Sequence, residues 1–174
     1  MEDEGNLLSR MRKIFSGEME EGEDAAEAVM DMVDEGYRQG VFLSSEAQMI
    51  RNIFAYGEKD AKSIMTHRKH MVALDGEETL ENALTFILEQ NKSRFPVYEE
   101  DIDSIIGTIH LRDAMKCYFN EQLRHIPIKQ LEEYIRPVSF IPETRSIDKL
   151  LKKMQEGKYH MAIVIDEYGQ TAGL

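Results

Sequence analysis

The side chains that could carry chemistry form three small groups along the chain. Two histidines lie three positions apart in His67-Arg68-Lys69-His70, but the cations between them oppose binding of a divalent ion. Glu99-Glu100-Asp101, with Asp103, has the composition of a solvated turn between strands, and a magnesium site there would need oxygens that converge on one point. Cys117 lies in the apolar stretch 115–119, which is the environment of an inert buried thiol.

The sequence contains no pattern that marks a common enzyme. It has no lysine-containing phosphate loop, no nucleophile elbow, no HExxH and no GxGxxG. A single cysteine forms neither an internal disulfide nor a thiolate zinc site. We therefore expect a protein that is not an enzyme, with no catalytic residue and no metal site.

Charge is distributed unevenly along the 174 residues, whose net charge is −12. Residues 1–46 hold 13 acidic and 4 basic side chains, whereas the remainder holds 20 and 17. The acidic segment predicts a solvated, partly helical arm, with a docking segment as the alternative. Nucleic-acid binding is excluded because clustered Lys and Arg are missing. We expect a cytoplasmic protein, because no apolar run is long enough to cross a bilayer and the N-terminus lacks a secretory signal.

Apolar spacing predicts two helices before residue 60. The first covers residues 25–37, and the second starts at Ser45, which stands three residues before Gln48 as in a capping box. Met49, Ile50, Ile53 and Phe54 form the predicted apolar stripe of the second helix.

From about residue 60 the chain repeats itself. Helical apolar spacing over 80–88, entered at Thr79, recurs over 147–154 after Ser146. Each helix leads into a short strand, an acidic turn and a strand that contains glycine. A closing helix over 111–119 completes the first copy, which therefore has the order strand, helix, strand, strand, helix.

The spacing between matching residues predicts the register of the two copies. Arg94 and Gly107 are 13 residues apart, as are His160 and Gly173, so the predicted offset is 66. The second copy stops at Leu174, before a last helix. We expect that the missing strand and helix belong to a longer parent protein or are supplied in trans.

Three strings carry a family resemblance: Ser63-Ile64-Met65-Thr66-His67-Arg68, Ser93-Arg94-Phe95-Pro96-Val97-Tyr98 and the stretch 159–169, YHMAIVIDEYG. They resemble the tandem CBS-domain (Bateman) module of the CorC/HlyC branch, which comprises hemolysin-related magnesium and cobalt efflux proteins of bacteria. The resemblance covers residues 45–174.

That resemblance implies an α/β (α+β) fold in which two CBS repeats pack as a Bateman module. The second repeat is truncated, and an acidic helical arm precedes the pair. The expected domains are an N-terminal extension over 1–44, a lead-in helix with the first repeat over 45–127, and an incomplete second repeat over 128–174.

The resemblance also implies a regulatory adenine-nucleotide sensor linked to magnesium and cobalt efflux. Its ligand would be AMP or ATP, alone or with magnesium, and its assembly a homodimer. A transporter or membrane domain elsewhere in the parent system would respond, which places the chain in the cytoplasm or at the inner face of the membrane. The alternative is a dimerisation or partner-docking module that needs no nucleotide.

The family motif has Gly, an apolar residue, any residue, Ser or Thr, two residues and Asp. Here Gly107 and Asp113 match, but His110 replaces the hydroxyl residue. Asp113 would accept from ribose hydroxyls, or would only complement a helix dipole. Arg94 would bind phosphate or form a surface ion pair. His160 would bind phosphate or form a wall of the pocket. The candidate nucleotide-binding residues are Thr66, Ala73, Ser93, Arg94, Phe95, Pro96, His110, Asp113, Val138, Phe140, Tyr159, His160, Met161 and Ala162.

Overall fold

A computed structural model describes residues 23–174 of the chain, so the part of the expected acidic extension before Glu23 lies outside the described residues. The chain divides into two compact units, Met1–Lys59 and Asp60–Leu174. The domain boundaries expected at residues 44 and 127 stay a prediction.

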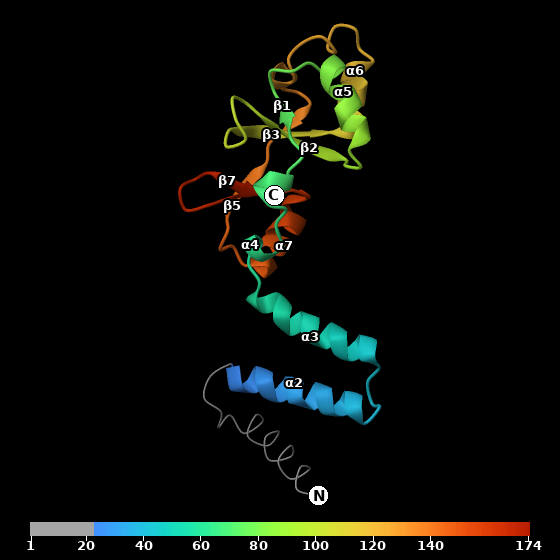
Figure 1. Ribbon diagram of the computed structural model, residues 1–174, viewed down its shortest axis with the longest axis vertical. Helices are drawn as coiled ribbons and strands as arrows, with labels where there is room; N and C mark the ends of the chain where they lie inside the picture. The colour runs from blue at the N-terminus through green and yellow to red at the C-terminus, as the bar shows by residue number, and fades with distance from the viewer. Residues whose placement is uncertain (1–22) are drawn as a thin grey trace, which may run out of the picture. The chain divides into compact units, whose positions relative to one another are not determined.

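The first unit contains a pair of adjacent helices, α2 (Glu23–Arg38) and α3 (Ser44–Glu58) (Figure 1). Both helices were predicted, but the start of the second was predicted wrongly. The helix begins at Ser44, and the carboxylate of Glu46 accepts from the backbone N–H of Leu43 at 2.8 Å. Glu46 rather than Gln48 therefore reaches back over the first turn, because the chain enters the helix one residue earlier.

The predicted apolar stripe of α3 is mostly exposed within the described residues, and only Ile50 is partly buried. Met49 and Ile53 are 63% and 70% exposed, and Phe54 is exposed as well. Ala47 is the buried residue of α3, and Arg51 forms an ion pair with Asp34 of α2. A small side chain and an ion pair thus occupy the positions where the sequence alone suggested a broad apolar contact.

The second unit holds the repeated elements, which follow the predicted order. Its bounds are α4 (Ala61–Ile64), η1 (Arg68–His70), β1 (Leu74–Asp75), α5 (Leu80–Glu89), β2 (Arg94–Tyr98), β3 (Ile105–His110), α6 (Leu111–Tyr118), η2 (Ile128–Gln130), β4 (Ile135–Arg136), β5 (Ser139–Pro142), α7 (Ile147–Gly157), β6 (Ala162–Ile165) and β7 (Thr171–Gly173). Thr79 caps α5 by accepting from the backbone N–H of Asn82. The predicted mixed α and β fold with two repeats is confirmed.

The first repeat has a four-stranded sheet in the order β1-β2-β3-β4. β1 and β2 are parallel, and the other neighbours are antiparallel. Helices α5 and α6 lie side by side next to this sheet (Figure 1). Their apolar faces bury the first core, which consists of Leu74, Leu80, Ala83, Ile87, Phe95, Val97, Ile109, Ala114, Cys117, Ile128 and Leu131.

The second repeat has a three-stranded sheet, β5-β6-β7, and its register corrects the predicted offset. Val97 pairs with Gly107, whereas Val164 pairs with Gly173. Those partners are ten residues apart in the first copy and nine in the second, because the second hairpin loop is one residue shorter. Strand β6 therefore matches β2 at an offset of 67, so that Met161 corresponds to Arg94 and His160 to Ser93.

The segment in front of each repeat pairs with the other repeat. Strand β4, which precedes the second repeat, pairs with β3 of the first through Thr108 and Arg136. The segment before β1 of the first repeat pairs in turn with the end of β7. The backbone N–H of Thr66 donates to the carbonyl of Leu174 at 2.7 Å, and the N–H of Leu174 donates back at 3.0 Å. The two repeats of this unit are thus joined by strand exchange.

Candidate functional site

The end of β3 and the start of α6 bring predicted site residues together. His110 is the N-cap of α6, and its Nδ1 accepts from the backbone N–H of Arg112 at 3.0 Å. A nitrogen that accepts this bond carries no proton, so the imidazole is neutral with its N–H at Nε2. The ring thereby does the capping that a Ser or Thr side chain would do at the start of a helix.

Three guanidinium groups act on this imidazole. Burial is the largest cause that lowers the pKa of His110, followed by the charges of Arg94 and Arg112, with Arg136 contributing in the same direction. The carboxylate of Asp113 acts against them. Among the described residues, none forms an ion pair with Arg94 or Arg112, so two cations here have no anionic partner.

Asp113 lies in the first turn of α6 and is only 4% exposed. One carboxylate oxygen accepts from Lys116 Nζ at 3.0 Å, and the other from an Arg136 nitrogen at 3.5 Å. The hydrogen bond from Lys116 is the main cause that lowers the pKa of Asp113 below its ordinary value. Asp113 therefore stays ionised at neutral pH as an acceptor inside a cationic cluster.

Gly107 makes the position of Arg136 possible. A Cβ at Gly107 would lie 2.5 Å from Ile135 Cγ2 and 2.7 Å from the carbonyl oxygen of Arg136. Only a residue without a side chain lets β4 approach β3 this closely. The glycine of the predicted motif thus positions an arginine from the linker between the repeats. We define Arg94, His110, Arg112, Asp113 and Arg136 as the first-repeat cluster.

The chemistry of the first-repeat cluster suits an anionic ligand that also carries hydroxyl groups. Arginine forms paired hydrogen bonds with phosphate oxygens, and the N-terminus of α6 adds its dipole. Asp113 supplies an acceptor for a hydroxyl. The role that the sequence suggested for His110 needs revision, because its Nδ1 is committed to the helix cap and only Nε2 can donate to a ligand.

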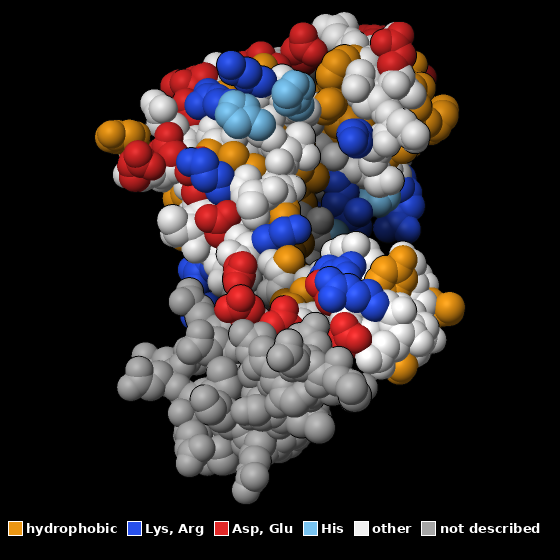
Figure 2. Space-filling model, turned by 60° about the horizontal axis from the view of Figure 1, so that its bottom comes forward, with side chains coloured by type: hydrophobic (Ala, Val, Ile, Leu, Met, Phe, Trp, Pro, Cys, Tyr) orange, Lys and Arg blue, Asp and Glu red, His pale blue; other side chains and the backbone are white. Residues whose placement is uncertain are grey.

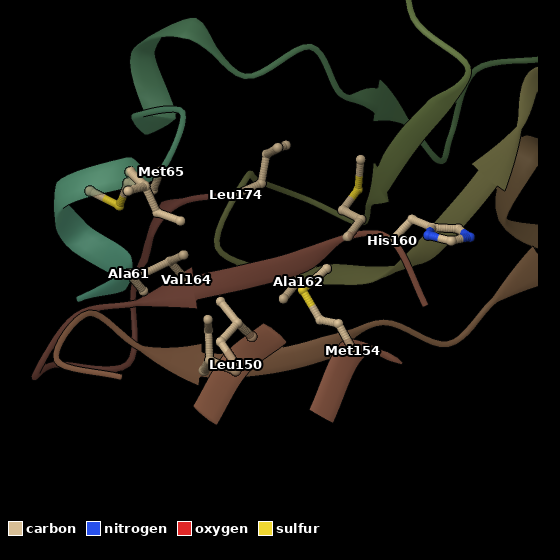
Figure 3. A pocket seen from close by; sticks show the side chains of 11 residues that line it. Ala61, Met65, Leu150, Met154, His160, Ala162, Val164 and Leu174 are labelled. Atoms are coloured by element: carbon tan, nitrogen blue, oxygen red, sulfur yellow. The ribbon is translucent and has the colours of Figure 1, made fainter. Parts of the chain in front are cut away.

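The second repeat contains an apolar pocket of about 260 Å³. Figure 3 shows side chains from α4, β6 and α7 pointing toward a shared space, while the imidazole of His160 points away from it. Its lining is almost entirely aliphatic or thioether and consists of Ala61, Ile64, Met65, Ile141, Leu150, Met154, His160, Met161, Ala162, Val164 and Leu174. Such walls suit a flat apolar ring system.

Part of this pocket corresponds to core positions of the first repeat. Ile141 pairs with Val164 as Leu74 pairs with Val97, and Leu74 and Val97 belong to a core that also contains Ala114 and Cys117 of α6. The floor of the pocket is therefore the surface on which the first repeat packs its closing helix. Met65, His160 and Met161, which also line the pocket, come from the segments that the sequence predicted for ligand binding.

The remaining predicted residues are placed less closely. Phe95 and Pro96 are fully buried in the first repeat, and the carbonyl of Ser93 accepts from the N–H of Leu111. Thr66 reaches the pocket through its backbone bonds to Leu174. Four more candidates neither line the pocket nor act on the pKa of His110: Ala73, Val138, Phe140 and Tyr159.

Sequence reasoning missed three residues of the cationic environment. Lys116 stands three residues after Asp113, a helical spacing that could have predicted the ion pair. Arg112 was part of the motif but received no role. Arg136 lies 23 residues from Asp113, and only the pairing of β3 with β4 brings it there, so no local pattern could reveal it.

Charged side chains of both signs alternate on the face shown in Figure 2, where histidines lie beside Lys and Arg. Within residues 23–174, no three His, Cys, Asp or Glu side chains converge as a metal site would require. No helix in that same part of the chain is long and apolar enough to cross a membrane.

Comparison with known proteins places these features in context. A family model described as "CBS domain" matches residues 61–120 and 128–174. The UPF0053 protein YugS of Bacillus subtilis is 37% identical over 143 residues, 82% of this chain and 32% of YugS. The magnesium and cobalt efflux protein CorC of Vibrio cholerae is 29% identical over 169 residues, 97% of this chain and 55% of CorC. The chain thus spans a third to about half of these two relatives.

A solved structure gives a closer match in length. The CBS domain of the bacterial CNNM/CorC family Mg2+ transporter, in complex with ATP, is 39% identical with a TM-score of 0.67. The match covers 74% of this chain and 89% of that one.

Proposed function

The chain belongs to the CBS-domain family, with relatives among CNNM/CorC-type proteins, and from this we propose that it is a regulatory module that binds an adenine nucleotide. The observation that carries the proposal is the first-repeat cluster, in which the charges of Arg94, Arg112 and Arg136 act on the imidazole of His110 beside the buried carboxylate of Asp113. Phosphate oxygens would accept hydrogen bonds from the guanidinium groups, and ribose hydroxyls would donate to Asp113. Binding of ATP is supported by the similar CBS domain that was solved in complex with ATP.

The apolar pocket of the second repeat is proposed as a second place for an adenine ring. This proposal is supported by His160 and Met161, two candidates from the sequence that line the pocket together with Met65. Magnesium, where it takes part, would arrive with the nucleotide. A ligand held by both repeats shifts their equilibrium only through different affinities for two arrangements, and a membrane domain or a homodimer partner would respond to that shift.

In the proposed setting, the module acts for a parent system that exports magnesium or cobalt and works at the inner face of the membrane. The name of CorC of Vibrio cholerae supports the link to efflux.

A second candidate is a docking or dimerisation module that needs no nucleotide. The observation in its favour is that Asp113 already accepts from Lys116 and Arg136, and that His110 Nδ1 already caps α6. The first-repeat cluster could then be a structural network that ties α6 to the linker.

Isothermal titration of the full chain with AMP, ADP and ATP, each with and without magnesium, distinguishes the two candidates. We expect binding that Arg94→Ala and Arg136→Ala each weaken at least tenfold, since a hydrogen bond to a charged group contributes about 1.5–3 kcal/mol and about 1.4 kcal/mol is tenfold. Arg145→Ala, which removes an exposed arginine of the second repeat, is the matched control. No binding of any nucleotide, or losses equal to the control, would favour the docking module.

A further inference from the structure

The hairpin loop between β2 and β3 is held in one conformation by its own hydrogen bonds. The backbone N–H of Glu99 donates to the carbonyl of Ser104 at 2.9 Å, and the N–H of Ser104 donates to the carbonyl of Asp101 at 3.0 Å. A carboxylate oxygen of Asp101 accepts from the N–H of Asp103 at 2.9 Å. Lys129 also anchors the loop through Glu99 at 2.8 Å. The side chain of Asp103 therefore projects from a fixed support.

The side chain of Asp103, which belongs to the first repeat, contacts the second repeat. Its Oδ1 accepts from the backbone N–H of Thr171, the first residue of β7, at 2.7 Å. The same carboxylate accepts from both terminal nitrogens of Arg68, at 3.0 and 3.3 Å. Thr171 is buried, and the side chains of Asp103 and Arg68 are only about one-third exposed. The sequence suggested that this acidic turn is merely solvated. The turn instead contains Asp103, whose carboxylate accepts hydrogen bonds from Arg68, in the segment before β1, and from Thr171 of β7.

The two partners of Asp103 belong to the same pair of strands. Arg68 follows the segment in which His67 bridges Gly173, and Thr171 starts the strand that leads to Gly173 and Leu174. Asp103 thus ties this ladder together at one end. The other end carries Met65 and Leu174, two walls of the apolar pocket.

The second hairpin offers a contrast within the same molecule. Asp166 accepts from the N–H groups of Tyr168 and Gln170 at 2.9 Å each, so its carboxylate is used within its own turn. Tyr168 follows Asp166 as Asp103 follows Asp101, and its side chain is exposed. The contact of Asp103 with the other repeat is therefore specific to the first hairpin, and the second hairpin has no equivalent among the hydrogen bonds of Asp166.

We propose that Asp103 is a positioning residue that couples the first-repeat hairpin to the second-repeat pocket. It holds β7 against the segment at Thr66 and so fixes the two walls formed by Met65 and Leu174. Strand β3 continues from this hairpin to His110, so the same rigid strand leads to the first-repeat cluster. Only the part of this inference that concerns nucleotide affinity rests on the proposed function.

Hydrogen exchange of the full chain without ligand tests the coupling. In Asp103→Ala we expect the amides of Thr171, Leu174 and Thr66 to exchange at least tenfold faster, while Val97 and Ile109 change by less than twofold. Asp103→Asn keeps an acceptor for Thr171 and should restore most of the protection. Asp148→Ala, which removes an exposed carboxylate of α7 paired with Lys152, is the charge-matched control. Unchanged exchange in Asp103→Ala, or faster exchange throughout the unit, would overturn the coupling.

Titration with AMP then tests the effect on the pocket. We expect the dissociation constant to rise at least fivefold in Asp103→Ala and to stay within twofold in Asp103→Asn and Asp148→Ala. An unchanged constant in Asp103→Ala would refute the claim that Asp103 shapes the binding site. If the wild-type chain binds neither AMP nor ATP, the proposed function fails, while the exchange experiment still decides whether Asp103 couples the repeats.

Discussion

Replacing Gly107 by alanine should be among the most damaging small substitutions in the second unit. The added Cβ would lie 2.5 Å from Ile135 Cγ2 and 2.7 Å from the carbonyl oxygen of Arg136. A carbonyl in a strand ladder moves only if the pairing of β3 with β4 opens. Overpacking costs about 1–3 kcal/mol, and the weakened backbone pairing adds about 1 kcal/mol. We therefore expect a loss of about 3 kcal/mol in the free energy of unfolding.

Gly169 provides the control for this substitution. It has no atom within 4 Å of an added Cβ, but its φ of +80° is unfavourable for alanine. Gly169→Ala should therefore cost only about 1 kcal/mol.

Thermal melts followed by circular dichroism would show the difference. At about 4 °C per kcal/mol, Gly107→Ala should lower Tm by about 12 °C and Gly169→Ala by about 4 °C. Equal shifts for the two variants would refute the argument that close approach of β4 is what requires glycine at position 107.

Three further predictions concern titratable groups of the first repeat. The pKa of His110 is lowered in the folded protein. Its contribution to stability is therefore present above its unfolded pKa of about 6.5 and is lost as pH falls through the folded value. Chemical denaturation between pH 7.5 and 5 should show this loss of stability, and His110→Ser, which can still cap α6, should make the loss smaller. The pKa of Asp113 is also lowered, so its contribution is present above about pH 3.9 and is lost below it. Asp113→Asn should flatten the stability profile between pH 5 and 3, and an unaltered slope would contradict the ion pairs with Lys116 and Arg136. Burial raises the pKa of the Cys117 thiol to about 11, so a thiol reagent at pH 8 should react at least 100-fold faster in urea than in the native protein, and rapid native labelling would exclude a buried thiol.

The elements of the repeats could be predicted from sequence because each depends on local patterns. Apolar spacing and the cap at Thr79 define α5, and the same spacing defines α7 after Ser146. Cys117 is buried as its apolar surroundings indicated. These features need only the preferences of neighbouring residues along one helix or strand.

Helix α3 shows why the same reasoning failed in the first unit. Periodicity identifies an apolar face but not what covers it, and within the described residues Met49 and Ile53 remain exposed. The offset between the repeats failed for a related reason. Equal spacing of Arg94–Gly107 and His160–Gly173 suggested a common register, whereas the shorter second loop moves β6 by one residue.

The candidate site was predictable only in the part that one segment supplies. His110 and Asp113 follow each other along the chain, and their meeting at the start of α6 needed no long-range information. Arg136 and Asp103 act across the boundary between the repeats, so their roles depend on which strands pair. That pairing is set by close backbone approach at Gly107 and Gly173, which a single sequence does not reveal.

The exchanged segments at Thr66 and β4 have a consequence for folding. Each sheet is completed by a segment that lies outside its own strands and helices, so contacts between residues distant in sequence must form to complete it, which slows folding. A single repeat expressed alone would carry an unpaired strand edge and the partner segment meant for its neighbour. The two different halves can complete each other's sheets, so cutting the chain between the repeats should yield a one-to-one complex of the two fragments rather than two separate monomers.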